Sequence, residues 1–190
     1  MKIALVCPDA FTVMQFRLGI IKALVQQGIS VHVIAAHDDY SDRVKSLEVT
    51  YHSVRVTRMI NPILDMKYFF SILKIFQSQR FDIVHNFTVK PNIYGAIAAK
   101  LAGCPRIIGT LEGLGFVFSD QFGIRSWWML KFLSVLYRIA FGLSDKVCFA
   151  NQDDLKRLVS ARIVHKSKSV LIRSAGINLD EFSSKIIDPT

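Results

Sequence analysis

The stretch from Phe81 to Phe118 reads FDIVHNFTVKPNIYGAIAAKLAGCPRIIGTLEGLGFVF, and its pattern decides the fold. A strand-like run, Asp82–His85, precedes a helix that Pro91 opens and Gly103 stops, and a second strand-like run, Arg106–Thr110, follows. This order predicts a βαβ unit. Its two strands are parallel, because a right-handed crossover returns the chain in its original direction.

Polar residues and glycines follow both strands of this unit. His85 and Asn86 end the first strand, and Thr110, Glu112, Gly113 and Gly115 follow the second. Ligands of parallel sheets collect beyond the carboxyl ends of the strands, where a crevice opens at the switch point of the strand order. We therefore expect the site at this edge of the sheet.

The rest of the chain continues the alternation of strands and helices. We predict one domain, an α/β doubly wound Rossmann-like parallel sheet with the first and fourth strands side by side. The predicted strands outside the central unit are Lys2–Cys7, Val31–Ala35, Thr50–Val56, Lys146–Ala150 and Val170–Ile172. The predicted helices are Gln15–Gln27, a short one within His37–Glu48, one from Pro62 to Gln79, one from Ile124 to Gly142 and one capped by Asn151.

Composition adds two expectations. Hydrophobic residues make up 51% of the 190 residues and the mean hydropathy is +0.33, so we expect a partner to cover part of the surface. The net charge of +9 points to phosphates, whether of nucleic acid, anionic lipid or substrate. Dispersed basic residues and the absence of zinc-ligand spacing or an aromatic RNP-like run argue against nucleic acid. We interpret Cys7, Cys104 and Cys148 as small buried hydrophobes.

Several cofactor classes lack their motifs. The turn after the first strand reads CPDAFTVMQF and has no glycine, which argues against NAD and FAD and disfavours a dinucleotide-dependent oxidoreductase. A P-loop, a nucleophile elbow and a metalloprotease motif are also missing from the sequence. We expect no cofactor and no metal.

Four residues at the predicted crevice are chemical candidates. His85 can hydrogen-bond a substrate hydroxyl or phosphate, or be an imidazole satisfied by local backbone. Glu112 can orient a sugar hydroxyl or act as a base, or merely accept backbone N–H bonds in a tight turn. Arg17 and Lys90 can neutralise a diphosphate, or be solvated surface charges.

The helix Ile124–Leu143 is apolar over most of its circumference and too interrupted by cations to span a bilayer. At about 100° per residue, Trp127, Lys131, Ser134 and Arg138 share one side. We predict that Trp127, Lys131 and Arg138 face an anionic membrane surface; an ordinary surface helix with a solvated polar stripe is the alternative.

The chain resembles the N-terminal domain of family 4 glycosyltransferases, retaining enzymes of the GT-B fold. The resemblance rests on FRLGIIKALVQQGISVHVIA, FDIVHNFTVKPNIYGAIAAKLAG, IIGTLEGLGFVF and SAGINLDEF in this order. It is greatest to bacterial transferases that extend undecaprenyl-diphosphate-linked sugars.

The resemblance implies one half of a two-domain enzyme: residues 1–175 as the acceptor-binding domain and 176–190 as the start of the interdomain linker. The donor-binding domain and its E-x7-E motif are absent from these 190 residues, so we expect no activity from the chain alone. Many relatives have a histidine after the strand that here ends at Thr110, and this chain has Glu112 in the comparable stretch.

The implied activity is transfer of a hexose or N-acetylhexosamine from a nucleotide sugar, expected to be UDP-linked, to a lipid-diphosphate-linked saccharide, in polysaccharide, lipopolysaccharide or glycan biosynthesis. The implied place is the inner face of the cytoplasmic membrane, with a donor domain in cis or in trans. The alternative is a non-catalytic membrane-binding scaffold or truncated remnant. We assign catalysis to Glu112 and His85, and substrate binding to Arg17, Asn86, Lys90, Asn92, Thr110, Gly113 and Gly115.

Overall fold

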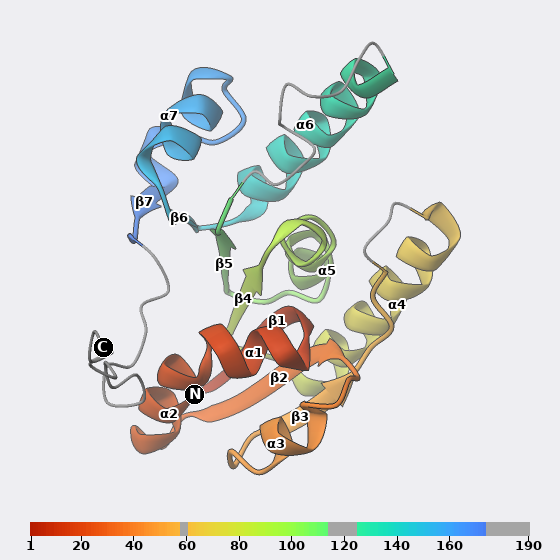
Figure 1. Cartoon of the computed structure of the whole chain (residues 1–190), viewed down its shortest axis with the longest axis vertical. Helices are drawn as coiled ribbons and strands as arrows, with labels where there is room; N and C mark the ends of the chain where they lie inside the picture. Colours follow the sequence, from red (N-terminus) through yellow and green to blue (C-terminus); the bar gives the residue numbers. More distant parts are fainter. Residues whose placement is uncertain (58–60, 114–124, 174–190) are drawn as a thin grey trace, which may run out of the picture.

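The computed structural model describes residues 1–57, 61–113 and 125–173, and it contains one sheet of seven parallel strands (Figure 1). The strand order is β3-β2-β1-β4-β5-β6-β7, so the predicted doubly wound sheet, with the first and fourth strands adjacent, is confirmed. The strands are β1 Lys2–Asp9, β2 Ser30–Ala36, β3 Thr50–Ser53, β4 Ile83–Phe87, β5 Arg106–Leu111, β6 Lys146–Phe149 and β7 Ser169–Leu171.

Helices cover both faces of the sheet. In Figure 1 α1, α2 and α3 lie on one side, α4, α5 and α6 lie on the other, and α7 packs against β6 and β7 at the end of the sheet. The helices are α1 Ala10–Phe16, α2 Leu18–Gln26, α3 Ser41–Lys45, α4 Pro62–Gln79, the π-helical turn η1 Pro91–Gly95, α5 Ala96–Leu101, α6 Arg125–Leu143, α7 Gln152–Ser160 and the 3-10 turn η3 Lys166–Lys168.

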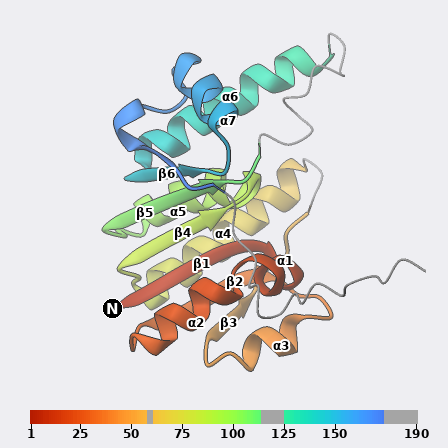
Figure 2. The ribbon, with the colours of Figure 1, turned by 60° about the vertical axis from the view of Figure 1, so that its left-hand side comes forward.

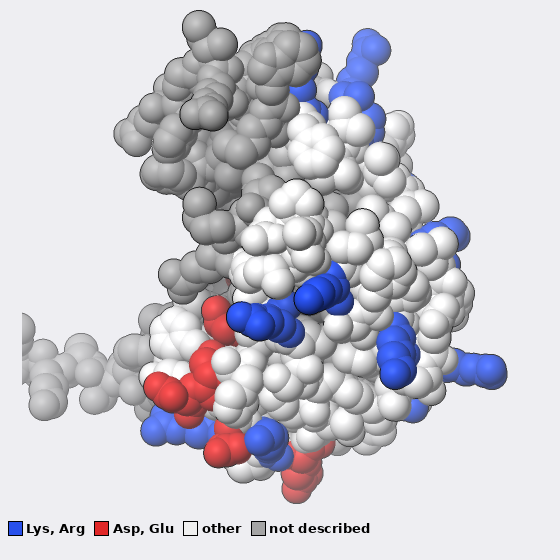
Figure 3. Space-filling view, turned by 90° about the vertical axis from the view of Figure 1, so that its right-hand side faces the viewer, with Lys and Arg blue, Asp and Glu red and all other residues white. Residues whose placement is uncertain are grey.

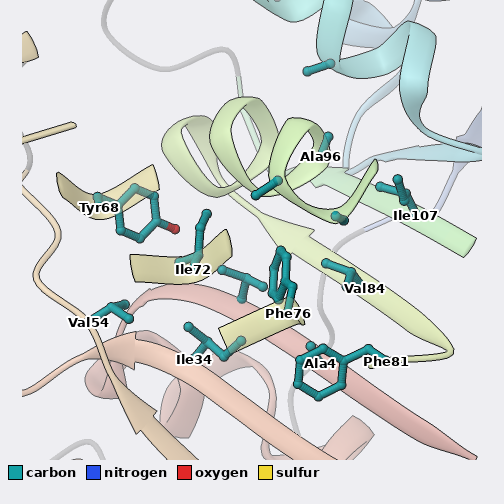
Figure 4. Packing of buried hydrophobic residues seen from close by; sticks show 14 residues of the cluster. Ala4, Ile34, Val54, Tyr68, Ile72, Phe76, Phe81, Val84, Ala96 and Ile107 are labelled. Carbon is teal, nitrogen blue, oxygen red and sulfur yellow. The ribbon is translucent and has the colours of Figure 1, made fainter. Parts of the chain in front are cut away.

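The alternation of β1 side chains divides the core into two layers. Ile3, Leu5 and Cys7 pack toward α1 and α2, whereas Ala4 and Val6 pack toward α4 and α5. Both faces of a central parallel strand are buried, which is why β1 is a continuous apolar run. Figure 4 shows Ala4 and Val84 of the sheet meeting Ile72 and Phe76 of α4.

Capping residues set the ends of the longer helices as the sequence predicts. The Asn61 side chain accepts a hydrogen bond from the N–H of Leu64 at 3.1 Å, and Pro62 occupies the first turn of α4. Asn151 accepts from the N–H of Asp154 at 2.8 Å at the start of α7. Each cap is formed by residues close together in the sequence, so it can be predicted without knowledge of the tertiary structure.

The predicted helix Gln15–Gln27 is wrong in its extent. Helix α1 begins at Ala10, because the Asp9 side chain caps it by accepting from the N–H of Thr12 at 2.8 Å. The helical path is broken at Arg17, whose φ is −121°, and α2 continues to Gln26. The break carries the Arg17 side chain into the protein, where it is buried.

Two smaller predictions also differ from the structure. Strand β3 ends at Ser53, so Val54–Val56 of the predicted strand lie outside it, although Val54 is buried against α4. The helix opened by Pro91 starts as a π-helical turn before α5. Among the cysteines, Cys7 and Cys148 are buried as predicted, whereas Cys104 is only partly buried; all three are free thiols.

Candidate functional site

The carboxyl ends of β1, β4 and β5 lie side by side, and the residues that follow them form the candidate site (Figure 2). His85 is in register with Leu5 of β1 and with Ile108 of β5, and Phe87 is in register with Thr110. The sheet therefore brings the predicted loops together at one edge.

Arg17 and Glu112 form an ion pair across this edge. The Arg17 Nη2 donates to Glu112 Oε1, and the two side chains are 5% and 31% exposed. The guanidinium also lies over the ring of Phe87, with its central carbon 4.0 Å from the ring centroid. The solvated-charge alternative for Arg17 is wrong, since Arg17 is an internal partner of Glu112.

His85 lies next to this pair and contacts Thr110. Its Nε2 is 2.7 Å from Thr110 Oγ1, and its ring centroid is 4.1 Å from that of Phe87. Burial lowers the pKa of His85 to about 3, and the positive charge of Arg17 adds to the shift. The imidazole is therefore neutral at physiological pH, and its hydrogen-bond partner is a side chain, not the local backbone.

Asn86 and Asn92 point away from this group. Asn86 is fully buried and faces the helix layer, where a Cβ on Gly95 would lie 2.0 Å from its Oδ1. Asn92 is 1% exposed, and its Nδ2 donates to the carbonyls of Thr88 at 2.6 Å and Thr110 at 2.8 Å. In these positions both amides pack inside the domain.

Lys90 belongs to a separate polar cluster. Its Nζ pairs with the buried carboxylate of Asp65 on α4 and donates to Thr57 Oγ1 at 2.9 Å. The Tyr94 hydroxyl lies 3.4 Å from Asp65 Oδ2. Lys90 is thus neither a solvated surface charge nor part of the Arg17–Glu112 group, and this arrangement neutralises a buried acid.

The remaining predicted residues are distributed as follows. Gly113 lies directly after Glu112 and is partly buried, whereas Gly115 falls outside the described residues. Trp127 is part of α6, but its side chain is outside the described part. Lys131 is exposed. Arg138 is exposed too, with Nε donating to the carbonyl of Arg162 at 3.1 Å and Nη2 to that of Ala161 at 3.3 Å.

Sequence reasoning missed three residues, Phe87 and Thr88 at this edge and Asp65 in the Lys90 cluster. Phe87 is the surface on which both Arg17 and His85 lie. Thr88 has a φ of +69°, a strained value for a β-branched residue, and its carbonyl accepts from Asn92. Asp65 could have been found, because it lies on the buried stripe of α4 together with Tyr68, Ile72 and Phe76. An acidic side chain on a buried helix face indicates that its carboxylate is paired with another group inside the protein.

The arrangement suits hydrogen bonding to a hydroxyl group. Glu112 presents a half-buried carboxylate, and with Oε1 engaged by Arg17 its second oxygen remains to accept. The neutral imidazole of His85 and the hydroxyl of Thr110 lie on the same side of the sheet. Among the described residues, no three His, Cys, Asp or Glu side chains group as metal ligands.

The comparisons with known proteins agree with this fold. Residues 2–151 match the family described as Glycosyl transferase 4-like. This chain belongs to that family. The fold matches one half of GT-B structures: a glycosyltransferase of Rickettsia africae superposes with a TM-score of 0.65 at 18% identity, covering 99% of this chain and 46% of that one.

Two curated proteins are similar to this chain in sequence. The chain is 28% identical over 185 residues to the N,N'-diacetylbacillosaminyl-diphospho-undecaprenol alpha-1,3-N-acetylgalactosaminyltransferase of Campylobacter jejuni, covering 96% of this chain and 48% of the relative. It is 28% identical over 129 residues to the UDP-Gal:alpha-D-GlcNAc-diphosphoundecaprenol alpha-1,3-galactosyltransferase of Escherichia coli, covering 68% of this chain and 32% of the relative. The chain thus spans less than half the length of either relative.

Proposed function

We propose that this domain binds the lipid-diphosphate-linked saccharide acceptor of a glycosyltransferase that transfers a hexose or N-acetylhexosamine from a UDP-linked sugar. Both curated relatives are named for transfer to undecaprenol-diphosphate-linked sugars, and one name gives UDP-galactose as donor. The observation that carries the proposal is the Glu112 carboxylate held at the carboxyl edge of β5, beside neutral His85.

In this proposal Glu112 accepts the hydrogen bond, and then the proton, of the acceptor hydroxyl that attacks the donor sugar. His85 and Thr110 hold the acceptor sugar, with Gly113 letting the backbone approach it. The nucleotide sugar lies against a donor-binding domain supplied in the same chain or by a second one. That domain stabilises the leaving diphosphate, which is why we expect the 190-residue chain alone to be inactive.

We further propose that the acceptor is reached from the inner face of the cytoplasmic membrane, with α4 and α6 lying on the headgroups. Both helices expose apolar residues at helical spacing: Ile63, Met66 and Phe70 on α4, and Phe132, Val135 and Ile139 on α6. Exposed lysines lie among them, Lys67 and Lys74 on α4 and Lys131 on α6. Among the described residues, no helix is long and apolar enough to cross a membrane.

The positions of α4 and α6 in the domain are consistent with a membrane-facing surface. Both helices begin at the edge where the strands end, so their first turns lie at the same edge of the sheet as the candidate site (Figure 2). Figure 3 shows this side of the molecule as largely uncharged, with scattered Lys and Arg and with the visible Asp and Glu gathered at its lower left. An apolar surface with interspersed cations suits an anionic bilayer surface, where each basic residue contributes about 1 kcal/mol.

The catalytic proposal is tested by activity of the protein that joins this domain to a donor-binding domain. Glu112→Gln and His85→Ala should each lower kcat/KM at least tenfold, equivalent to about 1.4 kcal/mol of transition-state stabilisation. The matched controls are Glu48→Gln and His37→Ala, which change exposed residues of the same types. Parental activity in folded Glu112 and His85 variants, or turnover by the 190-residue chain alone, would contradict the proposal. If the domain bound the acceptor but gave no turnover with any donor-binding domain, the alternative of a non-catalytic scaffold would be favoured.

The membrane proposal is tested by co-sedimentation with liposomes that contain anionic lipid. Phe70→Asn with Phe132→Asn, and Lys67→Glu with Lys131→Glu, should each reduce binding at least fivefold, the second pair in a salt-dependent way. The controls Leu101→Asn and Lys22→Glu change exposed residues on α5 and α2 and should bind like the parent. Equal binding by all variants would remove α4 and α6 from the membrane-facing surface.

A further inference from the structure

Arg17 is the most enclosed cation of the candidate site. Besides the bond from Nη2 to Glu112, its Nη1 donates to the carbonyl of Phe16 at 3.1 Å, and the face of the guanidinium lies on Phe87. The side chain is 5% exposed and reaches this place only because the helical path breaks at Arg17. Nη1, Nη2 and the flat face of the guanidinium are therefore already engaged inside the protein, and Nε is buried without a hydrogen-bond partner among the described residues.

This engagement argues against Arg17 as a direct ligand of a substrate diphosphate. An incoming phosphate would have to displace the Glu112 carboxylate from Nη2. Glu112 would then be left without its cation, and a half-buried charge that loses its partner is strongly disfavoured. The stack on Phe87 would also have to open for the guanidinium to reach an external ligand.

We propose that Arg17 is a positioning residue that fixes the side chain of Glu112 at the crevice for the reaction assigned above. It holds Glu112 through Oε1 alone, and among the described residues Oε2 has no hydrogen-bond partner. One oxygen is thus anchored while the other is presented to the acceptor hydroxyl. Phe87 of β4 in turn fixes the plane of the guanidinium. The sheet therefore positions the Glu112 side chain through Phe87 and Arg17. This inference rests on the proposed function.

A double-mutant cycle in the complete transferase tests the proposal. Arg17→Met should lower kcat at least tenfold and change KM for the acceptor less than threefold, because it disturbs Glu112 and no substrate contact. The double variant Arg17→Met/Glu112→Gln should be within threefold of Glu112→Gln alone, since Arg17 acts through Glu112. Arg17→Lys keeps a charge at this place and should recover part of kcat.

The opposite pattern would overturn the proposal. If Arg17 bound the diphosphate itself, Arg17→Met would raise KM for the acceptor tenfold or more, and its loss would multiply with that of Glu112→Gln. An inactive parent would refute the proposed function, whereas multiplicative losses in an active parent would refute only the role of Arg17.

If Arg17→Met folds poorly, a second variant and a second measurement still test the proposal. Phe87→Leu keeps both charges but removes the ring under the guanidinium, so kcat should fall by a smaller factor than in Arg17→Met, again with KM retained. In the 190-residue chain, NMR titration should show a higher pKa for His85 in Arg17→Met than in the parent, because a neighbouring positive charge is removed. An unchanged His85 titration in a folded variant would show that Arg17 does not occupy this place.

Discussion

Replacing Gly95 by alanine tests how tightly η1 is packed onto β4. A Cβ at residue 95 would lie 2.0 Å from Asn86 Oδ1 and 2.8 Å from its Cγ, far inside van der Waals contact. Asn86 is fully buried on a central strand, so its side chain has little room to move. We expect overpacking to destabilise the domain by about 1–3 kcal/mol, offset by about 0.5–1 kcal/mol of improved helix propensity.

The net loss, at most about 2.5 kcal/mol, should appear as a fall in Tm of up to about 10 °C for a chain of this size, measured by circular dichroism. Gly19→Ala is the matched control, because Gly19 also lies in a helix but a Cβ there meets nothing within 4 Å. This control should be neutral or gain up to about 1 kcal/mol.

The side chain of Asn86 is the obstacle in this reasoning, so removing it should relieve the clash. Asn86→Ala/Gly95→Ala should regain most of the stability lost in Gly95→Ala, with a coupling of about 1 kcal/mol or more. The Asn86→Ala change removes no hydrogen bond from the domain, since neither Oδ1 nor Nδ2 of Asn86 has a partner among the described residues. If Gly95→Ala were as stable as Gly19→Ala, or if the two changes were additive, the packing argument would be refuted.

Three further predictions concern stability. Asn61→Ala removes the cap on the N–H of Leu64 and should cost about 1 kcal/mol in urea unfolding. The pKa of His85 is about 3 in the folded domain and near 6.5 when unfolded, so its contribution is complete above about pH 6.5 and is lost as pH falls toward 3. By pH 5 the loss should be about 1–2 kcal/mol, and His85→Gln should remove it. Thr88→Gly should stabilise the domain by up to about 1 kcal/mol, because glycine adopts a φ of +69° without steric strain.

Much of the fold could be predicted because its signals are local. Apolar runs bounded by glycine, proline and asparagine mark most strands and helices, and the handedness of βαβ crossovers limits how they pair. The break at Arg17 could not be predicted in this way. It depends on a bond to Glu112, 95 residues further along the chain, and on the ring of Phe87.

The sequence predicts a candidate site at the carboxyl edge of the sheet, but the residues assigned to that site outnumber those that the structure brings together there. Side chains of neighbouring strand residues point to opposite faces, so His85 and Asn86 of β4 cannot both face the crevice. The structure places His85 beside Arg17 and Thr110, and Asn86 against Gly95 in the other layer. This part of the error could have been avoided from the period of the strand alone.

The structure changes the expectation that Arg17 and Lys90 bind a diphosphate. Arg17 is paired with Glu112 and Lys90 with buried Asp65, so both charges are balanced by acids within the domain. The net charge of +9 must then reside on other residues, and Lys67, Lys74 and Lys131 are exposed among the apolar side chains of α4 and α6. In the proposed membrane orientation, this basic excess would contact the lipid headgroups more than the candidate site. The diphosphate of the proposed acceptor would then lie between the candidate site and the bilayer, which leaves Glu112 to contact the sugar.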